Sequence, residues 1–167
     1  KLADGRITKI AQTESDKLLL TIKKSISSPE QKTIRTQNRL VISVNPSLPL
    51  LYLTQENQNA PLQAPTFCMV LRKHLNNCKI NLIEQIGLER VLCMHLEHLN
   101  EMGDYCRKKL YIELMGKHSN IIFCDENDQI IDSIKHISAL VSSVREVLPG
   151  RQYFIPNTLD KYDPLTI

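Results

Sequence analysis

The chain has 167 residues, 42% of them hydrophobic, and a formal net charge of +3, which suits one globular domain and is too little charge to attract nucleic acid without clustering. Its five cysteines include no Cys-x-x-Cys pair, which argues against a disulfide scaffold and indicates reduced thiols in a cytoplasmic protein. No window approaches the roughly 20 apolar residues of a membrane-spanning helix and no secretory leader opens the chain, so we expect no membrane insertion.

The first third of the chain predicts four strands. Apolar residues alternate loosely over residues 6–12, through Ile7 and Ile10, and clearly over residues 17–24, where Leu18, Leu20 and Ile22 share a face, which is the period of a strand. Residues 25–37 are polar and aperiodic, which predicts a mobile hairpin connection. Two further strands are predicted over residues 40–44 and 50–53.

A helix is predicted after the loop of residues 55–65. Thr66 follows a proline and is a candidate N-cap. From there, mostly apolar residues recur every three or four positions until the Asn76-Asn77 pair, where we expect the helix to end. The side of the helix that they share is formed by Phe67, Val70, Leu71, His74 and Leu75.

The second half of the chain predicts five more strands, over residues 79–85, 90–99, 108–115, 119–124 and 129–136. Turn residues rich in Gly, Asn and Asp separate the last three of them, as antiparallel hairpins require. The total of nine strands and one helix indicates an α+β domain dominated by antiparallel sheet, either a sandwich or an open barrel.

The hairpin of residues 110–125 has the clearest alternation, with successive residues of its first strand on opposite faces. Its tip, residues 116–120, contains glycine, serine and asparagine, which favour chain reversal. The tip also presents Lys117 and His118. Two interpretations stay open for these side chains, a solvated turn and an anion contact.

Cys93, His95 and His98 lie close together in the sequence, as metal ligands often do. In a strand, however, Cys93 and His95 face one side and His98 the other, and no second ligand pair has zinc-like spacing. We therefore expect neither a metal nor another cofactor. The chain has no Gly-x-Ser-x-Gly elbow and no Gly-rich phosphate loop, so a hydrolase or nucleotidase has no support.

Basic residues recur beside the predicted elements. Each group alone is typical of a solvated surface, but together they would form a phosphate-binding face if the fold gathered them. The chain has only three phenylalanines and five tyrosines, which favours recognition of the backbone and shape of a folded RNA over base stacking. The basic groups are Arg72-Lys73-His74, Arg90, Arg107-Lys108-Lys109, Lys117-His118 and Lys135-His136.

Several segments, in their order and spacing, resemble the N-terminal domain of the NFACT family, which includes the bacterial FbpA/RqcH proteins and eukaryotic NEMF. They are residues 67–75 (Phe-Cys-Met-Val-Leu-Arg-Lys-His-Leu), 85–91 (Gln-Ile-Gly-Leu-Glu-Arg-Val), 148–153 (Leu-Pro-Gly-Arg-Gln-Tyr) and the hairpin of 110–125. The likeness is greatest to the bacterial branch, of a streptococcal, fibronectin-binding type.

The resemblance implies a domain over residues 1–156 that lacks the family's first helix, with a tail or the start of a linker over residues 157–167. Residues 1–4 read like the last turn of a helix and include no initiator methionine. We therefore interpret the chain as a fragment, which leaves an upstream targeting signal open.

The function implied by the resemblance is that of a module in a ribosome-associated quality control factor. Members of the family bind the obstructed large ribosomal subunit with its peptidyl-tRNA and recruit alanyl-tRNA, so that an alanine tail is added to the stalled nascent chain. The N-terminal domain contributes to holding the tRNA. The resemblance implies a binding module that is not itself catalytic.

The resemblance also implies contact residues. The family's Asp-Arg pair falls on Glu89-Arg90, where the acidic side chain is one methylene longer, so the carboxylate is placed differently while the arginine is kept. The hairpin motif is expected to contact tRNA or to fix this pair. The residues implied for tRNA binding are Arg72, Lys73, Glu89, Arg90, Lys117, His118 and Asn120.

The implied fold is similar to the N-terminal domain of formamidopyrimidine-DNA glycosylases, a mostly antiparallel β-sandwich or open barrel with one or two flanking helices. Those enzymes attack with an N-terminal proline beside a glutamate, and this chain begins with neither. We therefore expect no glycosylase activity.

An alternative function is a fibronectin-binding adhesin domain on a bacterial surface, the role for which relatives of this type were named. An exposed strand edge could pair with the sheet of a fibronectin module. The free cysteines and the lack of a tandem repeat favour the cytoplasmic role over this one.

Overall fold

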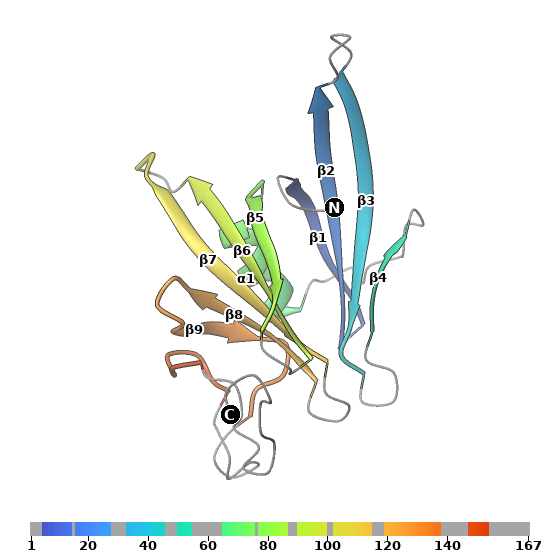
Figure 1. Ribbon diagram of the computed structural model, residues 1–167. Helices are drawn as coiled ribbons and strands as arrows, with labels where there is room; N and C mark the ends of the chain where they lie inside the picture. The colour runs from blue at the N-terminus through green and yellow to red at the C-terminus, as the bar shows by residue number, and fades with distance from the viewer. Residues whose placement is uncertain are drawn as a thin grey trace, which may run out of the picture.

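The computed structural model describes residues 5–14, 16–27, 33–45, 50–54, 65–75, 77–86, 90–99, 102–114, 119–137 and 147–153. Within these residues, nine strands form one open antiparallel sheet with a single helix against it (Figure 1), which confirms the predicted sheet-dominated α+β fold. The elements are β1 (Arg6–Glu14), β2 (Lys17–Ser27), β3 (Thr33–Ser43), β4 (Leu50–Thr54), α1 (Thr66–Leu75), β5 (Lys79–Gln85), β6 (Val91–Leu99), β7 (Tyr105–Glu113), β8 (Asn120–Asp125) and β9 (Ile130–Ser133).

The sheet consists of two sets of strands that meet at one narrow junction. The strand order is β4-β3-β2-β1-β5-β6-β7-β8-β9. In the described part of the chain, β1 and β5 pair only at Arg6 and Lys79, whereas β2 and β3 pair along their whole length. A backbone hydrogen bond from Ile80 N to the carbonyl of Gly5, 2.8 Å long, lies beside that pair. Figure 1 shows β1–β4 and β5–β9 diverging from the junction.

Helix α1 joins the two sets of strands. Its residues Phe67, Leu71 and Leu75 are buried, because their spacing places them on one side of the helix. They pack in a core that also contains Ile10 of β1 and Phe123 of β8. The helix therefore holds together two parts of the sheet that hardly pair with each other.

The bounds of α1 agree with the prediction. The backbone N–H of Met69 donates to the carbonyl of Pro65 over 3.1 Å, so Pro65 rather than Thr66 occupies the capping position. The chain leaves the helix through Asn77, whose φ of 64° lies in the left-handed region that asparagine tolerates.

One prediction about the strands is wrong. The predicted mobile connection over residues 25–37 is largely strand, because β2 continues to Ser27 and β3 begins at Thr33, with these two residues paired. Antiparallel pairing uses backbone groups and needs no apolar face, so the polar composition misled the prediction. The other strands agree within a few residues; β7 begins earlier, at Tyr105, and β9 ends earlier, at Ser133.

The second half of β7, residues 110–113, is buried on both faces. Leu110 and Ile112 face the core that contains α1, and Tyr111 and Glu113, on the opposite or outer face, are also buried. The ring of Tyr153 stacks on that of Tyr111, with centroids 4.0 Å apart. The predicted alternation is therefore confirmed, but a second core covers the outer face. This outer core consists of Val91, Cys93, Tyr111, Ile122, Cys124, Ile130, Val147 and Tyr153.

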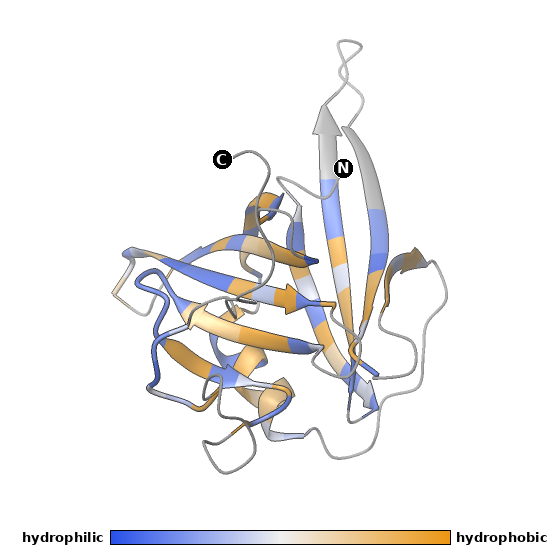
Figure 2. Ribbon diagram, turned by 60° about the horizontal axis from the view of Figure 1, so that its bottom comes forward, coloured by the Kyte–Doolittle hydropathy of each residue, from blue (hydrophilic) through white to orange (hydrophobic). Residues whose placement is uncertain are grey.

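Figure 2 shows apolar residues concentrated in the strands and the helix, whereas the turns that it colours are largely hydrophilic. Among the described residues, α1 is the only helix, and it is too short to cross a membrane.

Candidate nucleic-acid interface

The ends of three neighbouring strands, β6, β7 and β8, lie side by side close to residues that the sequence predicted as contact residues. Val91 of β6 pairs with Glu113 of β7, and Glu113 pairs with Asn120 of β8. Arg90 directly precedes this row, is exposed, and accepts a backbone hydrogen bond from Leu114 N over 2.9 Å. The edge therefore holds Arg90 beside the base of the 110–125 hairpin.

Three of the predicted contact residues, Glu89, Lys117 and His118, lie outside the described residues. Their tRNA contacts, and the choice between a solvated tip and an anion contact, stay predictions. We use the name strand-end site for the described residues of this edge, Arg90, Asn120, Lys135 and His136.

Asn120 is fully buried, and its side chain makes hydrogen bonds that hold part of the strand-end site together. Its Nδ2 donates to the carbonyl of Lys135 over 3.0 Å, and its Oδ1 accepts from the backbone N–H groups of Lys135 (3.1 Å) and Ile121 (2.9 Å). Direct contact of Asn120 with tRNA stays a prediction, and in this position the side chain fixes the chain after β9 to the base of the hairpin.

The sequence analysis predicted Lys135 and His136 only as one of several basic groups. The Nζ of Lys135 donates to the carbonyl of Val44 over 2.6 Å, which ties β9 to the far set of strands. Burial lowers the pKa of Lys135, and the charge of Asp16 opposes this shift. The ammonium group thus has a hydrogen-bond acceptor within the domain.

His136 is the more exposed member of a pair with Asp132. Its Nε2 lies 2.6 Å from Oδ1 of Asp132, and the aspartate is buried, so the carboxylate orients the ring while the ring faces solvent. No signal in the sequence could have revealed this pair, because a spacing of four residues brings side chains together in a helix, whereas here the chain bends after β9.

The two predicted helix residues lie elsewhere. Arg72 Nε donates to the carbonyl of Ile10 over 2.8 Å, so this side chain anchors α1 to β1. Lys73 is exposed on the helix. A role of either residue in tRNA binding stays a prediction, and the described contacts of Arg72 are with β1 rather than with the strand-end site.

The fold does not gather all basic groups on one face. Lys109 lies on the outer face, where its Nζ is 3.1 Å from Oδ1 of Asp128. Lys108, the residue before it, points to the side of α1, where its charge acts on His74. The alternation of β7 therefore separates neighbours that the sequence presents as one cluster.

His74, in the last turn of α1, should make stability depend on pH. Burial lowers its pKa below 6.5, and the charges of Lys108, Lys73 and His98 lower it further. The folded protein then binds fewer protons than the unfolded chain as the pH falls below about 6.5. We expect this stability contribution to be complete above that pH and to be lost progressively below it, toward the folded-state pKa.

Urea unfolding at a series of pH values measures this effect. A His74→Gln variant should show a flatter decline in the free energy of unfolding over the same window, because glutamine carries no proton to titrate. An unchanged decline in that variant would assign the pH dependence to other groups.

Glu84, Cys93 and His95 lie together on the outer face. The Nε2 of His95 is 2.7 Å from Oε1 of Glu84, and the donor atoms of all three residues lie within 4.8 Å of one another. Cys93 and His95 share a face, as predicted, and Glu84 joins them. Burial raises the pKa of the Cys93 thiol to about 11, so a metal would have to displace its proton. We assign no metal to this group.

The whole chain, residues 1–167, matches the family described as the NFACT N-terminal and middle domains. The protein therefore belongs to the NFACT family, as the sequence motifs predicted. It is 40% identical over 166 residues to the Rqc2 homolog RqcH of Bacillus subtilis, covering 99% of this chain and 28% of that protein. It is 38% identical over 168 residues to RqcH of Streptococcus pneumoniae, covering 100% of this chain and 29% of that protein. The chain thus spans less than a third of the length of these relatives.

Solved structures agree with this assignment. The N-terminal domain of the fibronectin-binding protein PavA from Streptococcus pneumoniae superposes with a TM-score of 0.84 at 37% identity, over 100% of this chain and 59% of that one. The N-terminal part of the fibronectin/fibrinogen-binding protein from Streptococcus suis gives a TM-score of 0.84 at 32% identity, over 99% and 59%.

Proposed function

We propose that the chain is a tRNA-binding module of a ribosome quality control factor. In this role the whole protein binds the obstructed large ribosomal subunit and alanyl-tRNA, and adds alanine to the stalled nascent chain in the cytoplasm. The domain contributes contacts rather than catalysis. The proposal is supported by the two RqcH relatives, at 40% and 38% identity over nearly the whole chain.

The observation that carries the proposal is the position of Arg90. It is exposed where β6 and β8 begin and β7 ends, and a backbone hydrogen bond with Leu114 fixes its main chain. A guanidinium group can hold a phosphate through two parallel hydrogen bonds. His136 adds an exposed imidazole next to Lys135, which Asn120 binds at the base of the hairpin. Such a polar group suits contact with an RNA backbone.

Replacing Arg90 with alanine in the full-length protein is expected to weaken tRNA binding about tenfold, since a charge-assisted hydrogen bond to phosphate is lost. The slope of log K against log salt should fall by about 1, because one fewer counterion is released. Titration with labelled tRNA at several salt concentrations gives both quantities, and alanine tailing should fall with them.

The matched control is Lys9→Ala, which removes an exposed cation of β1 that belongs to neither the strand-end site nor the predicted contact residues. This variant should keep its tRNA affinity. Equal affinity of the Arg90→Ala variant and the unaltered protein, with both folded by circular dichroism, would remove Arg90 from the site.

A second candidate function is fibronectin binding at a bacterial surface, which the names of two structural neighbours suggest. Edge strand β4 has exposed Tyr52 and Leu53, to which a partner strand could add. Surface biotinylation of intact cells, together with solution binding to fibronectin, separates the two functions. A protein found wholly inside the cell would exclude the adhesin as a native role.

A further inference from the structure

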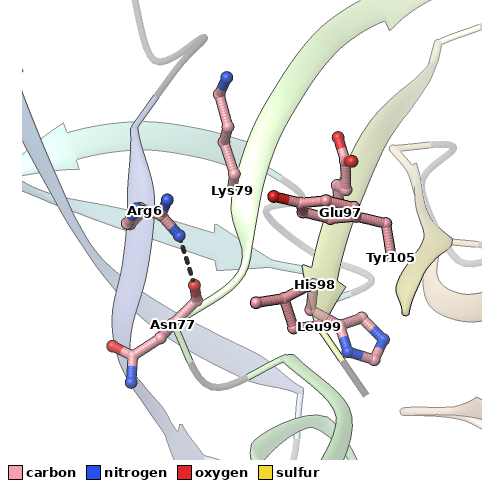
Figure 3. A pocket seen from close by; sticks show the side chains of 7 residues that line it. All are labelled: Arg6, Asn77, Lys79, Glu97, His98, Leu99 and Tyr105. Carbon is pink, nitrogen blue, oxygen red and sulfur yellow. Dashed lines mark hydrogen bonds between the residues drawn. The ribbon is translucent and has the colours of Figure 1, made fainter. Parts of the chain in front are cut away.

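A cavity of about 420 Å³ lies at the junction of the two sets of strands, at the end of β6 that is farthest from Arg90. Figure 3 shows Arg6 and Lys79 along one side of it and His98, Leu99 and Tyr105 along the other. The cavity lies beside the one position at which β1 and β5 pair among the described residues, Arg6 with Lys79. Side chains of both sets of strands therefore line it.

The described walls of this cavity carry two cations, Arg6 and Lys79, and one carboxylate. Arg6 is exposed, and its Nη1 donates to the carbonyl of Asn77 over 3.2 Å, which holds the guanidinium at the rim. Among the described residues of the lining, Glu97 is the one acidic side chain, and its Oε2 accepts a hydrogen bond of 2.8 Å from Asn81. The charge facing the cavity therefore favours an anion.

His98 borders the cavity, but its ring turns to the opposite face of β6 from Leu99 and Tyr105. Its charge acts there on His74 of α1. The subsite therefore does not depend on His98.

Tyr105 gives the cavity an aromatic wall. Its side chain is 72% exposed, and Leu99, its cross-strand partner, is 58% exposed. A large ring so exposed beside cations offers a platform on which a nucleobase can stack. The low number of aromatic residues argued against base stacking in the sequence, but the fold places one of them where stacking is feasible.

We propose that this cavity is a second RNA subsite that takes one unpaired nucleotide, with its phosphate held by Arg6 and Lys79 and its base against Tyr105. The inference rests on the proposed function, since the nucleotide belongs to the tRNA engaged by the strand-end site. The nine residues of β6 separate the two sites by about 30 Å. An RNA that contacts both must therefore be a large, folded one.

The test uses the full-length protein and three variants, Tyr105→Ala, Tyr105→Phe and Lys79→Gln. Tyr105→Ala should weaken tRNA binding about five- to tenfold through loss of stacking, whereas Tyr105→Phe keeps the ring and should bind as the unaltered protein does. Lys79→Gln should reduce the salt slope by about 0.7 to 0.9, the release expected for one phosphate contact. Tyr52→Ala, an exposed tyrosine on β4, is the matched control and should bind normally.

The outcomes separate the subsite from the function on which it rests. Normal binding by Tyr105→Ala beside weakened binding by Arg90→Ala overturns the subsite alone. Equal losses in Tyr105→Ala and Tyr105→Phe overturn stacking as its basis. Absence of any tRNA binding by the unaltered protein overturns both proposals. Thermal unfolding of each variant checks the fold, and an exposed side chain such as Tyr105 should leave Tm unchanged.

Discussion

Truncation of Phe123 to alanine is expected to lower the free energy of unfolding by about 3–5 kcal/mol. Among the described residues, Phe123 is the largest side chain that is fully buried. It lies opposite Leu110 in the β7–β8 pairing, and its ring centroid is 5.7 Å from that of His74 on α1. The truncation thus opens a void where helix and sheet meet, and the rigid strands around it cannot close that void fully.

Urea or guanidinium unfolding measures this loss, and Tyr52→Ala serves as the control because its ring is 40% exposed. The control should change the free energy of unfolding by less than about 1 kcal/mol. A Phe123→Ala variant that lost no more than the control would mean that α1 does not pack on β8 as described.

Replacement of Tyr153 by phenylalanine is expected to destabilise the fold by about 1–3 kcal/mol. The Tyr153 hydroxyl donates to Oε2 of Glu113 over 2.7 Å, and the glutamate side chain is fully buried. The variant keeps the ring that stacks on Tyr111 but leaves a buried carboxyl oxygen without this donor, and water cannot readily replace it.

The control for Tyr153→Phe is Tyr105→Phe, which removes a hydroxyl from an exposed ring and should leave stability unchanged. A double-mutant cycle with Glu113→Gln isolates the pair itself. Additive effects of Tyr153→Phe and Glu113→Gln would show that the two side chains do not depend on each other.

Alternation and helical spacing were enough to place nine strands and the helix, because apolar periodicity reports directly which side chains are buried. The same signal is silent where pairing uses backbone groups alone, which is why the extension of β2 to Ser27 and the early start of β3 at Thr33 were missed. Apolar periodicity also does not indicate which residues cover the outer face of β7. Tyr153 covers Tyr111 from 42 positions along the chain, and no local pattern specifies that contact.

The candidate site was predictable in part. Family motifs pointed to Arg90, and the structure places it exposed at a strand edge beside the predicted hairpin. The positions of the buried Asn120 and the half-buried Lys135 depend on hydrogen bonds between β8, the chain after β9 and Val44. Such bonds join residues far apart in the sequence, so their geometry exists only once the sheet has formed.

Burial of residues 110–113 of β7 on both faces affects how the alignment of β7 with its neighbouring strands is fixed. In a strand with one solvated face, a slip of one residue would expose the apolar side chains, and this penalty fixes the alignment. Here a slip would exchange one buried apolar residue for another, such as Leu110 for Tyr111. Glu113 and Asn120, which are paired with each other and fully buried, would lose their partners on Tyr153 and Lys135. The hydrogen bonds of these two polar side chains thus fix the register of β7 against β8. Burial of apolar residues cannot fix that register in this part of the sheet.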